Sequence, residues 1–337
     1  MFYKLNYDLI REIMRFVAPK KWIIRPDIPN NIITYTFISK HPQAFDYLME
    51  HNEYIDWGHF SSQPYSEHVD YLLQHPEYIN WVSFSSNRHP KAKQYCMLYP
   101  DLVCWNMFSI HTDNDSVQFM INHNHLEKIS LYIFSINPNP LAVSYMMDKW
   151  YKDKKYHFEK NTNQTVVEFY IKLHKDKPFS DISSEFFLNE NDTAISFLLQ
   201  HVDQWTPHQW SLFCTNKNKR AITFVMQHPD RINWDKFSTV RDRDAFSFMI
   251  RHPQRVVWSY INLNPADYAV DYLLLHTEYI HFTSFIMNQN RNAFEYCLQQ
   301  IDKFDVWLKS MVQLNPSIFI PKENKEMIEL LTRSFLV

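Results

Sequence analysis

A tryptophan recurs every 24 residues in two stretches of the chain, and in most units a phenylalanine follows it three residues later. The repeated places are Trp57, Trp81, Trp105, Trp210, Trp234, Trp258 and, with phenylalanine instead, Phe282. Side chains three residues apart lie on one face of a helix, so the pattern predicts a short amphipathic helix in every unit. Units of this length pack on their neighbours, and the repeat therefore predicts a helical array rather than separate globular domains.

Each unit is predicted to contain two helices, the first longer than the second. In the first readable unit, Pro42 suits the first turn of a helix, where its missing N–H has no consequence. Asp56 precedes the second helix and can accept an unpaired backbone N–H, as can Asn80 and Asn233 in other units. Helices of about eleven and seven residues are not stable alone in water. We therefore expect the Trp and Phe of one unit to be buried against the Tyr and Leu of the next.

The predicted fold is all-α, a right-handed α-solenoid of about a dozen short helix-turn-helix repeats with a capping helix at each end. Regular repeats cover residues 40–136 and 189–320, and residues 321–337 form the C-terminal capping helix. Residues 1–39 hold the N-terminal capping helix and a degenerate first unit, with a second partial unit starting at Asn315. Residues 137–188 are degenerate repeats with a lysine-rich insertion. Insertions in repeat arrays often mark the contact surface. For the lysines themselves, a solvated loop or a bend is favoured over a phosphate-binding patch.

The N-terminal segment has two interpretations. Residues 6–17 carry apolar side chains at spacings of three and four, which predicts an amphipathic helix that caps the first repeat. The string Leu5-Asn6-Tyr7-Asp8-Leu9-Ile10, followed by Glu12-Ile13-Met14, resembles the opening helix of the F-box family. That resemblance implies docking on an adaptor of ubiquitin ligases. Asn6 stands where the family usually has proline.

Composition narrows the possible functions. The formal charge is −3, so no duplex nucleic acid partner is indicated. Gly58 is the single glycine, which argues against a Gly-rich phosphate loop and against tight hairpins. No apolar run reaches the ~18 residues of a membrane helix, and the N-terminus lacks a signal-peptide core. We expect a protein of the cytoplasm or of a particle assembled there, neither secreted nor transmembrane.

Histidine is the most suggestive residue type, with 17 copies. One column stands at the end of the first helices: His51, His75, His123, His201, His228, His252 and His276. Stacked helices lie about 8–10 Å apart, whereas zinc ligands lie about 2 Å from one ion, so one histidine per unit does not form a metal site. We expect these rings to cap the last carbonyls of the helix, with a pH-sensing role as the alternative.

Neither a catalytic constellation nor a cofactor site is indicated. GxSxG, HExxH, P-loop and dinucleotide motifs do not occur. The four cysteines, Cys96, Cys104, Cys214 and Cys297, have no CxxC spacing and take repeat positions that hold apolar or small polar residues elsewhere. The tryptophans share faces with apolar positions, which favours structural stacking over base recognition. We predict a non-enzymatic protein with no catalytic, cofactor-binding or metal-binding residues, and its binding residues are unknown from the sequence.

The unit, a helix ending in His-Pro or Asn-Pro followed by Ile-Asn/Asp-Trp, two residues and Phe-Ser, is similar to short helical repeats in proteins of giant and other large DNA viruses. The similarity covers Lys40 to Val312, apart from the middle stretch. It implies a viral origin and a repeat protein without enzymatic activity. We expect a protein–protein interaction scaffold with viral or host protein partners and no nucleic acid, membrane or small-molecule substrate. The alternatives are a structural component of the virion or capsid and an F-box-like ubiquitin-ligase substrate adaptor.

Overall fold

The computed structural model describes residues 22–26, 28, 38–122, 130–150 and 158–321 of the chain. Both predicted capping helices lie outside the described residues, as do the F-box-like string and part of the lysine-rich insertion. The all-α class is confirmed, because the described residues form 20 α-helices and only one small sheet, of two strands.

Helices follow one another in pairs along the chain. The first helices of the pairs are α3 (Phe45–Glu50), α5 (Ser66–Gln74), α7 (Pro90–Leu98), α9 (Asn114–Asn122), α11 (Pro140–Trp150), α12 (Gln164–His174), α13 (Asp192–Leu199), α15 (Lys219–Met226), α17 (Arg243–Met249), α19 (Asp267–Leu275) and α21 (Arg291–Gln299). The second helices are α4 (Trp57–Ser62), α6 (Trp81–Phe84), α8 (Trp105–Phe108), α10 (Leu131–Ser135), α14 (Pro207–Phe213), α16 (Trp234–Phe237), α18 (Trp258–Ile261), α20 (Phe282–Phe285) and α22 (Val306–Met311). In the stretch predicted to be degenerate, the 3₁₀ helices η5 (Phe158–Lys160) and η7 (Ser184–Leu188) stand in the second place.

The predicted N-caps begin the second helices. The side chain of Asp56 accepts the backbone N–H of His59 at 3.0 Å, and Asn80 accepts that of Ser83 at 3.1 Å. Asn233 accepts from Lys236 in the same way, also at 3.1 Å. Each cap satisfies one of the backbone donors that a helix start leaves without a partner.

Phenylalanine forms the fully buried column of the core. Phe60, Phe84, Phe108, Phe213, Phe237 and Phe285 are all 0 % exposed. The tryptophans stack on the next unit as predicted: Trp81 lies parallel to Tyr95 at 6.0 Å, and Trp258 to Tyr272 at 6.1 Å. Their burial is less complete than expected, however, because Trp57, Trp81 and Trp234 are only partly buried. Each of these tryptophans begins its short helix, whereas the phenylalanine three residues later packs inside the array.

Buried asparagine amides join most units to the one before them. Asn161 Nδ2 donates to the backbone carbonyls of Ser135 and Asn137, both at 2.9 Å, and its Oδ1 accepts the backbone N–H of Asn163. The same pair of hydrogen bonds to backbone carbonyls of the preceding unit is made by Asn87, Asn189, Asn216, Asn288 and Asn315. We call these places the ladder positions. Histidine holds two of these positions, His41 and His111, and His111 Nε2 lies 3.0 Å from the carbonyl oxygen of Ser85.

A second column of buried side chains joins consecutive second helices. The hydroxyl of Ser85 accepts the backbone N–H of Cys104 at 2.9 Å, and that of Ser61 accepts the N–H of Asn80 at 3.0 Å. The corresponding bonds run from Ser130 to Ser109, from Val257 to Ser238 and from His281 to the side chain of Asn262. These bonds satisfy backbone groups that would otherwise be buried without a partner.

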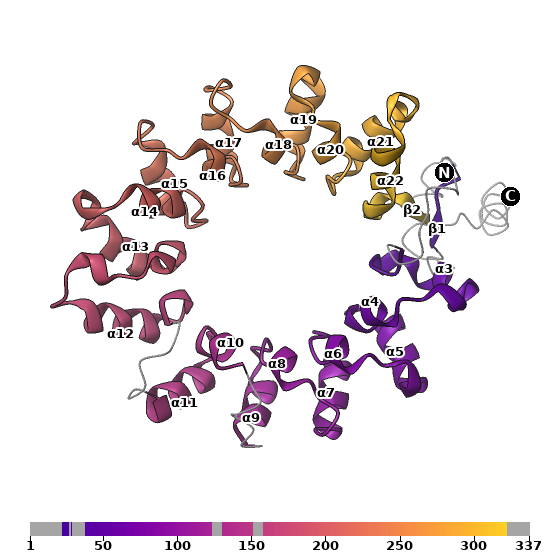
Figure 1. The fold of residues 1–337 in the computed structure, drawn as a ribbon, viewed down its shortest axis with the longest axis horizontal. Coiled ribbons are helices and arrows are strands. Elements are labelled where there is room, and N and C mark those ends of the chain that lie inside the picture. The colour runs from indigo at the N-terminus through magenta and orange to yellow at the C-terminus, as the bar shows by residue number, and fades with distance from the viewer. Residues whose placement is uncertain (1–21, 27, 29–37, 123–129, 151–157, 322–337) are drawn as a thin grey trace, which may run out of the picture.

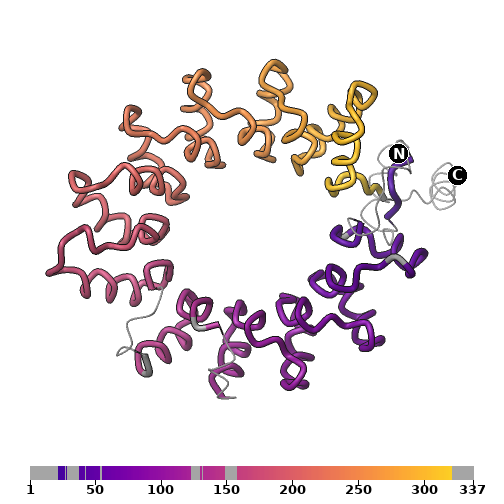
Figure 2. The backbone as a smooth tube through the Cα atoms, viewed as in Figure 1, coloured from indigo at the N-terminus to yellow at the C-terminus, as the bar shows by residue number. Residues whose placement is uncertain are grey.

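The helix pairs follow a ring, and the two ends of the described chain meet (Figure 1). The second helices lie toward the centre and the first helices toward the outside, most clearly for α8 and α10 against α9 and α11. Strand β1 (Trp22–Ile24) pairs antiparallel with β2 (Phe319–Pro321), with Ile23 opposite Ile320. Figure 2 shows the backbone returning to its starting point along this path.

The two ends build one unit together. The N-terminal half ends at Lys40, and the hydroxyl of Ser39 just before it accepts the backbone N–H of Asp56 at 3.1 Å, as Ser61 accepts that of Asn80. The C-terminal half begins at the ladder residue Asn315. His41 Nε2 then lies 2.8 Å from the carbonyl oxygen of Gln313, which repeats the contact of His111 with Ser85. The degenerate first unit and the partial last unit predicted from the sequence are thus two halves of one unit, which we call the split unit (residues 22–26, 28, 38–40 and 315–321).

Candidate functional site

Most of the histidine column caps helix ends, as predicted. The Nδ1 atoms of His51, His201, His228 and His252 lie 2.9–3.0 Å from the backbone carbonyl four residues earlier. Two members differ, because His75 and His276 face the carboxylates of Glu77 and Glu278, each at 3.6 Å. His123 lies outside the described residues. Across the described part of the chain, no three His, Cys, Asp or Glu side chains are grouped so that they could hold a metal ion.

Among the described histidines, His68 is the one whose buried ring nitrogens both lack a hydrogen-bond partner. It stands in α5 at a place that is alanine in most other units, such as Ala44, Ala92 and Ala269, and it is 0 % exposed. The ring lies 5.2 Å from Phe45 and 4.6 Å from Phe60, centroid to centroid. Burial in this aromatic environment lowers the pKa of His68 to about 4.

Stability should therefore fall as the medium is acidified. His68 has a pKa near 6.5 in the unfolded chain and about 4 in the folded protein, so the unfolded state takes up the proton first. The free energy of unfolding is expected to drop by about 3 kcal/mol between pH 6.5 and pH 4 on account of this group. Above pH 6.5 the group has no effect. Urea unfolding at several pH values across this range, in wild type and in His68→Ala, measures the effect. If the free energy of unfolding depends on pH equally in the two proteins, the prediction is contradicted.

The cysteines are packed as small apolar residues. Cys96 and Cys297 are 0 % exposed at the core place that Leu48, Leu72 and Met120 hold in other units. Burial raises the pKa of both thiols to about 12, so they stay protonated at neutral pH. Burial also raises the pKa of Cys214, whereas Cys104 is only partly buried. The three buried thiols, Cys96, Cys214 and Cys297, therefore lack the lowered pKa of a catalytic nucleophile.

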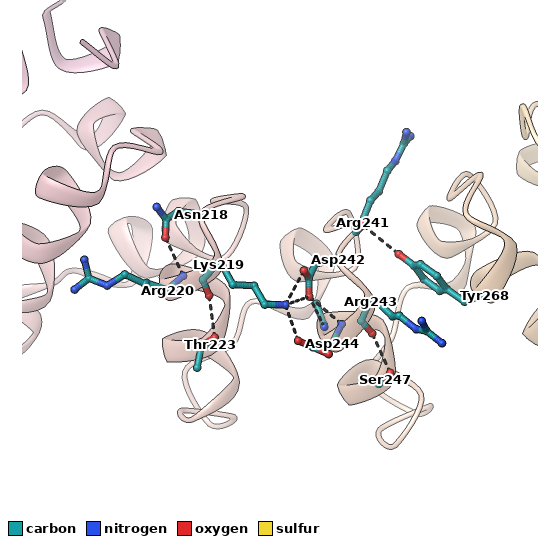
Figure 3. A network of polar contacts seen from close by, with 11 residues as sticks. Asn218, Lys219, Arg220, Thr223, Arg241, Asp242, Arg243, Asp244, Ser247 and Tyr268 are labelled. Atoms are coloured by element: carbon teal, nitrogen blue, oxygen red, sulfur yellow. Dashed lines mark hydrogen bonds and ion pairs between the residues drawn. The ribbon is translucent and has the colours of Figure 1, made fainter. Parts of the chain in front are cut away.

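Charged residues link neighbouring units near the starts of the first helices. Lys219 Nζ donates to Asp242 at 2.9 Å and to Asp244 at 2.6 Å, so one ammonium spans α15 and α17 (Figure 3). Partial burial opposes ionisation of Asp242, but its hydrogen bonds with Lys219 and with the Ala245 backbone N–H outweigh this and lower its pKa. Lys91 with Asp70 and Lys93 with Asp113 make similar bridges, each at 2.6 Å. These side chains act as cross-links between units, and the lysines are held by carboxylates.

A cavity of about 450 Å³ lies beside the stretch in which the sequence pointed to a contact surface. Phe179 and Ile182 line one part of it, and Thr206 and Gln209, which form the capping box of α14, line another. No Asp, Glu, His, Lys, Arg or Cys lines this cavity. The cavity therefore offers shape and hydrogen bonds but no acid or base for catalysis.

Large apolar side chains are exposed at the end of α7. Leu98 is 73 % exposed, Tyr99 46 % and Leu102 51 %, and the three lie within one turn, closed by a hydrogen bond from the Leu102 N–H to the Tyr99 carbonyl. We call this segment the α7 turn. Val82, which follows Trp81, adds a further exposed apolar side chain, and the Trp81 ring contacts Tyr99 at 6.5 Å. The 24-residue pattern did not reveal this site, because it follows the buried positions and carries no information on the exposed ones, where residue types vary from unit to unit.

Within the described residues, no helix has the length and apolar character needed to cross a bilayer. Comparison of the chain with models of known protein families, with curated proteins and with solved structures finds no match.

Proposed function

We propose that the chain is a non-enzymatic repeat protein, a right-handed α-solenoid closed on itself, that serves as a protein–protein interaction scaffold. The observation that carries this proposal is the α7 turn, with Leu98 73 % exposed. Exposed apolar clusters on otherwise polar surfaces are typical of contact sites. A viral origin is part of the proposal and rests on the resemblance of the repeat. The partner is therefore a viral or host protein.

The distribution of charge supports a protein partner over nucleic acid. The described second helices, which face the centre of the ring, carry few cations, and Lys236 is adjacent to Asp235. A ring that encircles a duplex needs many phosphate-binding cations on this face. We therefore propose no nucleic acid partner, and the sequence-based expectation of no membrane or small-molecule partner is kept as part of the proposal.

Affinity purification from cells of the natural host tests the proposal. A protein retained by the wild-type chain should be lost when Leu98 and Leu102 are both replaced by serine. Leu275→Ser is the matched control, because Leu275 ends α19 as Leu98 ends α7 and is 81 % exposed. Retention by the double variant, or equal loss in the control, would count against the α7 turn as the contact.

A structural role in the virion is the second candidate. It is favoured by the closure of the ring, because the two described ends of the array pair with each other within one chain and leave neither end of the array open. Mass spectrometry of purified particles distinguishes the candidates. Copy numbers comparable to those of capsid proteins would support the second and weaken the first.

A further inference from the structure

The split unit has a property that no other joint of the ring has. Elsewhere, covalent connections run through each unit, whereas here the two halves come from opposite ends of the chain and are held by non-covalent contacts alone. Strand β1 meets β2, and the Arg25 backbone N–H donates to the Ile318 carbonyl at 2.9 Å. Each half buries apolar groups against the rest: Ile28 and Ile38 on one side, Ile318 and Phe319 on the other.

The contacts across the split unit are directional. Arg25 donates two hydrogen bonds to the carboxylate of Glu295, at 2.6 and 3.0 Å, and its guanidinium lies 5.9 Å from the centroid of Phe294. The hydrogen bonds from Arg25 lower the pKa of Glu295 and, together with the charges of Arg25 and Arg291, outweigh the opposing effect of partial burial, so the pair stays charged at neutral pH. The N-terminal end of the described chain supplies the cation of Arg25 and the imidazole of His41, which directly follows the split unit. The C-terminal end supplies the carboxylate of Glu295 and the carbonyl of Gln313, which precede the split unit.

Two unlike surfaces that fit each other form a heterologous contact. Such a contact closes a ring when the two surfaces belong to one body, and it joins successive copies head to tail when they belong to different bodies. The curvature of the array need not change greatly for copies to join head to tail. A small displacement along the ring axis turns a closed ring into one turn of a helix, whose ends then meet the ends of other copies.

We propose that the split unit also assembles between two copies of this chain, so that the N-terminal half of one copy completes the C-terminal half of another and gives head-to-tail oligomers. The partner is a second copy because it presents the same strand, the same carboxylate and the same ladder carbonyl as the chain's own end. The ring and the oligomer then share one interface and differ only in which copy supplies each half.

Charge exchange at the Arg25–Glu295 pair tests this. Arg25→Glu alone and Glu295→Arg alone each place like charges at the joint of their own chain. When the two variants are mixed, each joint between unlike copies again has opposite charges. We expect light scattering after size-exclusion chromatography to show about tenfold more dimer and larger species in the mixture than in either variant alone at equal total concentration. Equal amounts before and after mixing would overturn the proposal.

Single-cysteine exchange tests it without altering the charges. Chains with Ile23→Cys and chains with Ile320→Cys are mixed at high concentration in mild urea, returned to buffer and oxidised. A disulfide-linked dimer containing one chain of each kind is the expected product, because residues 23 and 320 are strand partners. The chain that carries both cysteines, oxidised as a closed monomer beforehand, is the control and should form no oligomer. Absence of the mixed dimer, or oligomers of the locked control, would overturn the proposal.

Discussion

Replacing Phe84 by alanine should destabilise the protein by about 3–5 kcal/mol, the largest effect we expect from a single core position. Phe84 is 0 % exposed and ends α6 between the units on either side, with its ring 6.0 Å from that of Trp81 and 6.3 Å from that of Tyr95. Truncation leaves a cavity that the rigid helix pairs on both sides cannot close. Urea unfolding gives the total loss, and amide hydrogen exchange in α6 and α7 shows whether the loss is local, as expected for an array of stacked units.

Two neighbouring positions serve as controls for Phe84. Trp81→Ala should cost about half as much, because this ring is only partly buried although it stacks on Tyr95. Val82→Ala should change stability by less than about 0.5 kcal/mol, since the side chain is 54 % exposed. Equal losses for Phe84 and Val82 would mean that the phenylalanine column is not the core.

Asn161→Ala is expected to cost at least about 3 kcal/mol although it removes little apolar area. The substitution leaves the carbonyls of Ser135 and Asn137 and the backbone N–H of Asn163 without their side-chain partner in a buried place. Each buried polar group without a partner costs about 1–3 kcal/mol. Thermal or urea unfolding measures the loss.

Asn264 provides the matched control for Asn161. It holds the same ladder position, but the Nδ2 of its buried amide has no partner among the described residues, and only its Oδ1 accepts a bond, from Ala266 N–H. Asn264→Ala should therefore cost about 1 kcal/mol. A cost for Asn264 as large as that for Asn161 would show that the amide bonds are not what joins the units.

The sequence predicted the helix pairs, the N-caps at Asp56 and Asn80 and the stacking of Trp81 on the next unit, because these depend on neighbours at a fixed spacing. Burial was assigned less well, since periodicity places Trp81 and Phe84 on one face but does not say which lies deeper. His68 was missed as a buried group although Ala44 and Ala92 stand 24 residues on either side of it, because the sequence analysis followed the aromatic positions and not the alanine positions of the repeat.

Closure of the ring was beyond the reach of the repeat pattern. His41 and Asn315 are recognisable as ladder residues, but the sequence does not say that the unit missing before His41 and the unit missing after Asn315 are the same unit. That depends on the small rotation between successive helix pairs, which accumulates around the whole array. The candidate contact site at the α7 turn was missed for a different reason, because exposed leucines at Leu98 and Leu102 break no periodic rule.

An intramolecular disulfide across the split unit tests the closed ring most directly. In the chain with Ile23→Cys and Ile320→Cys, the two cysteines face each other on paired strands, whereas three of the native thiols are buried and Cys104 is partly buried. At low protein concentration, mild oxidation should give a monomer that migrates faster on a non-reducing gel and has lost two alkylatable thiols, while either single variant is unchanged. If both introduced thiols remain free to alkylate and the monomer does not change its migration, the ends do not meet and the ring is wrong.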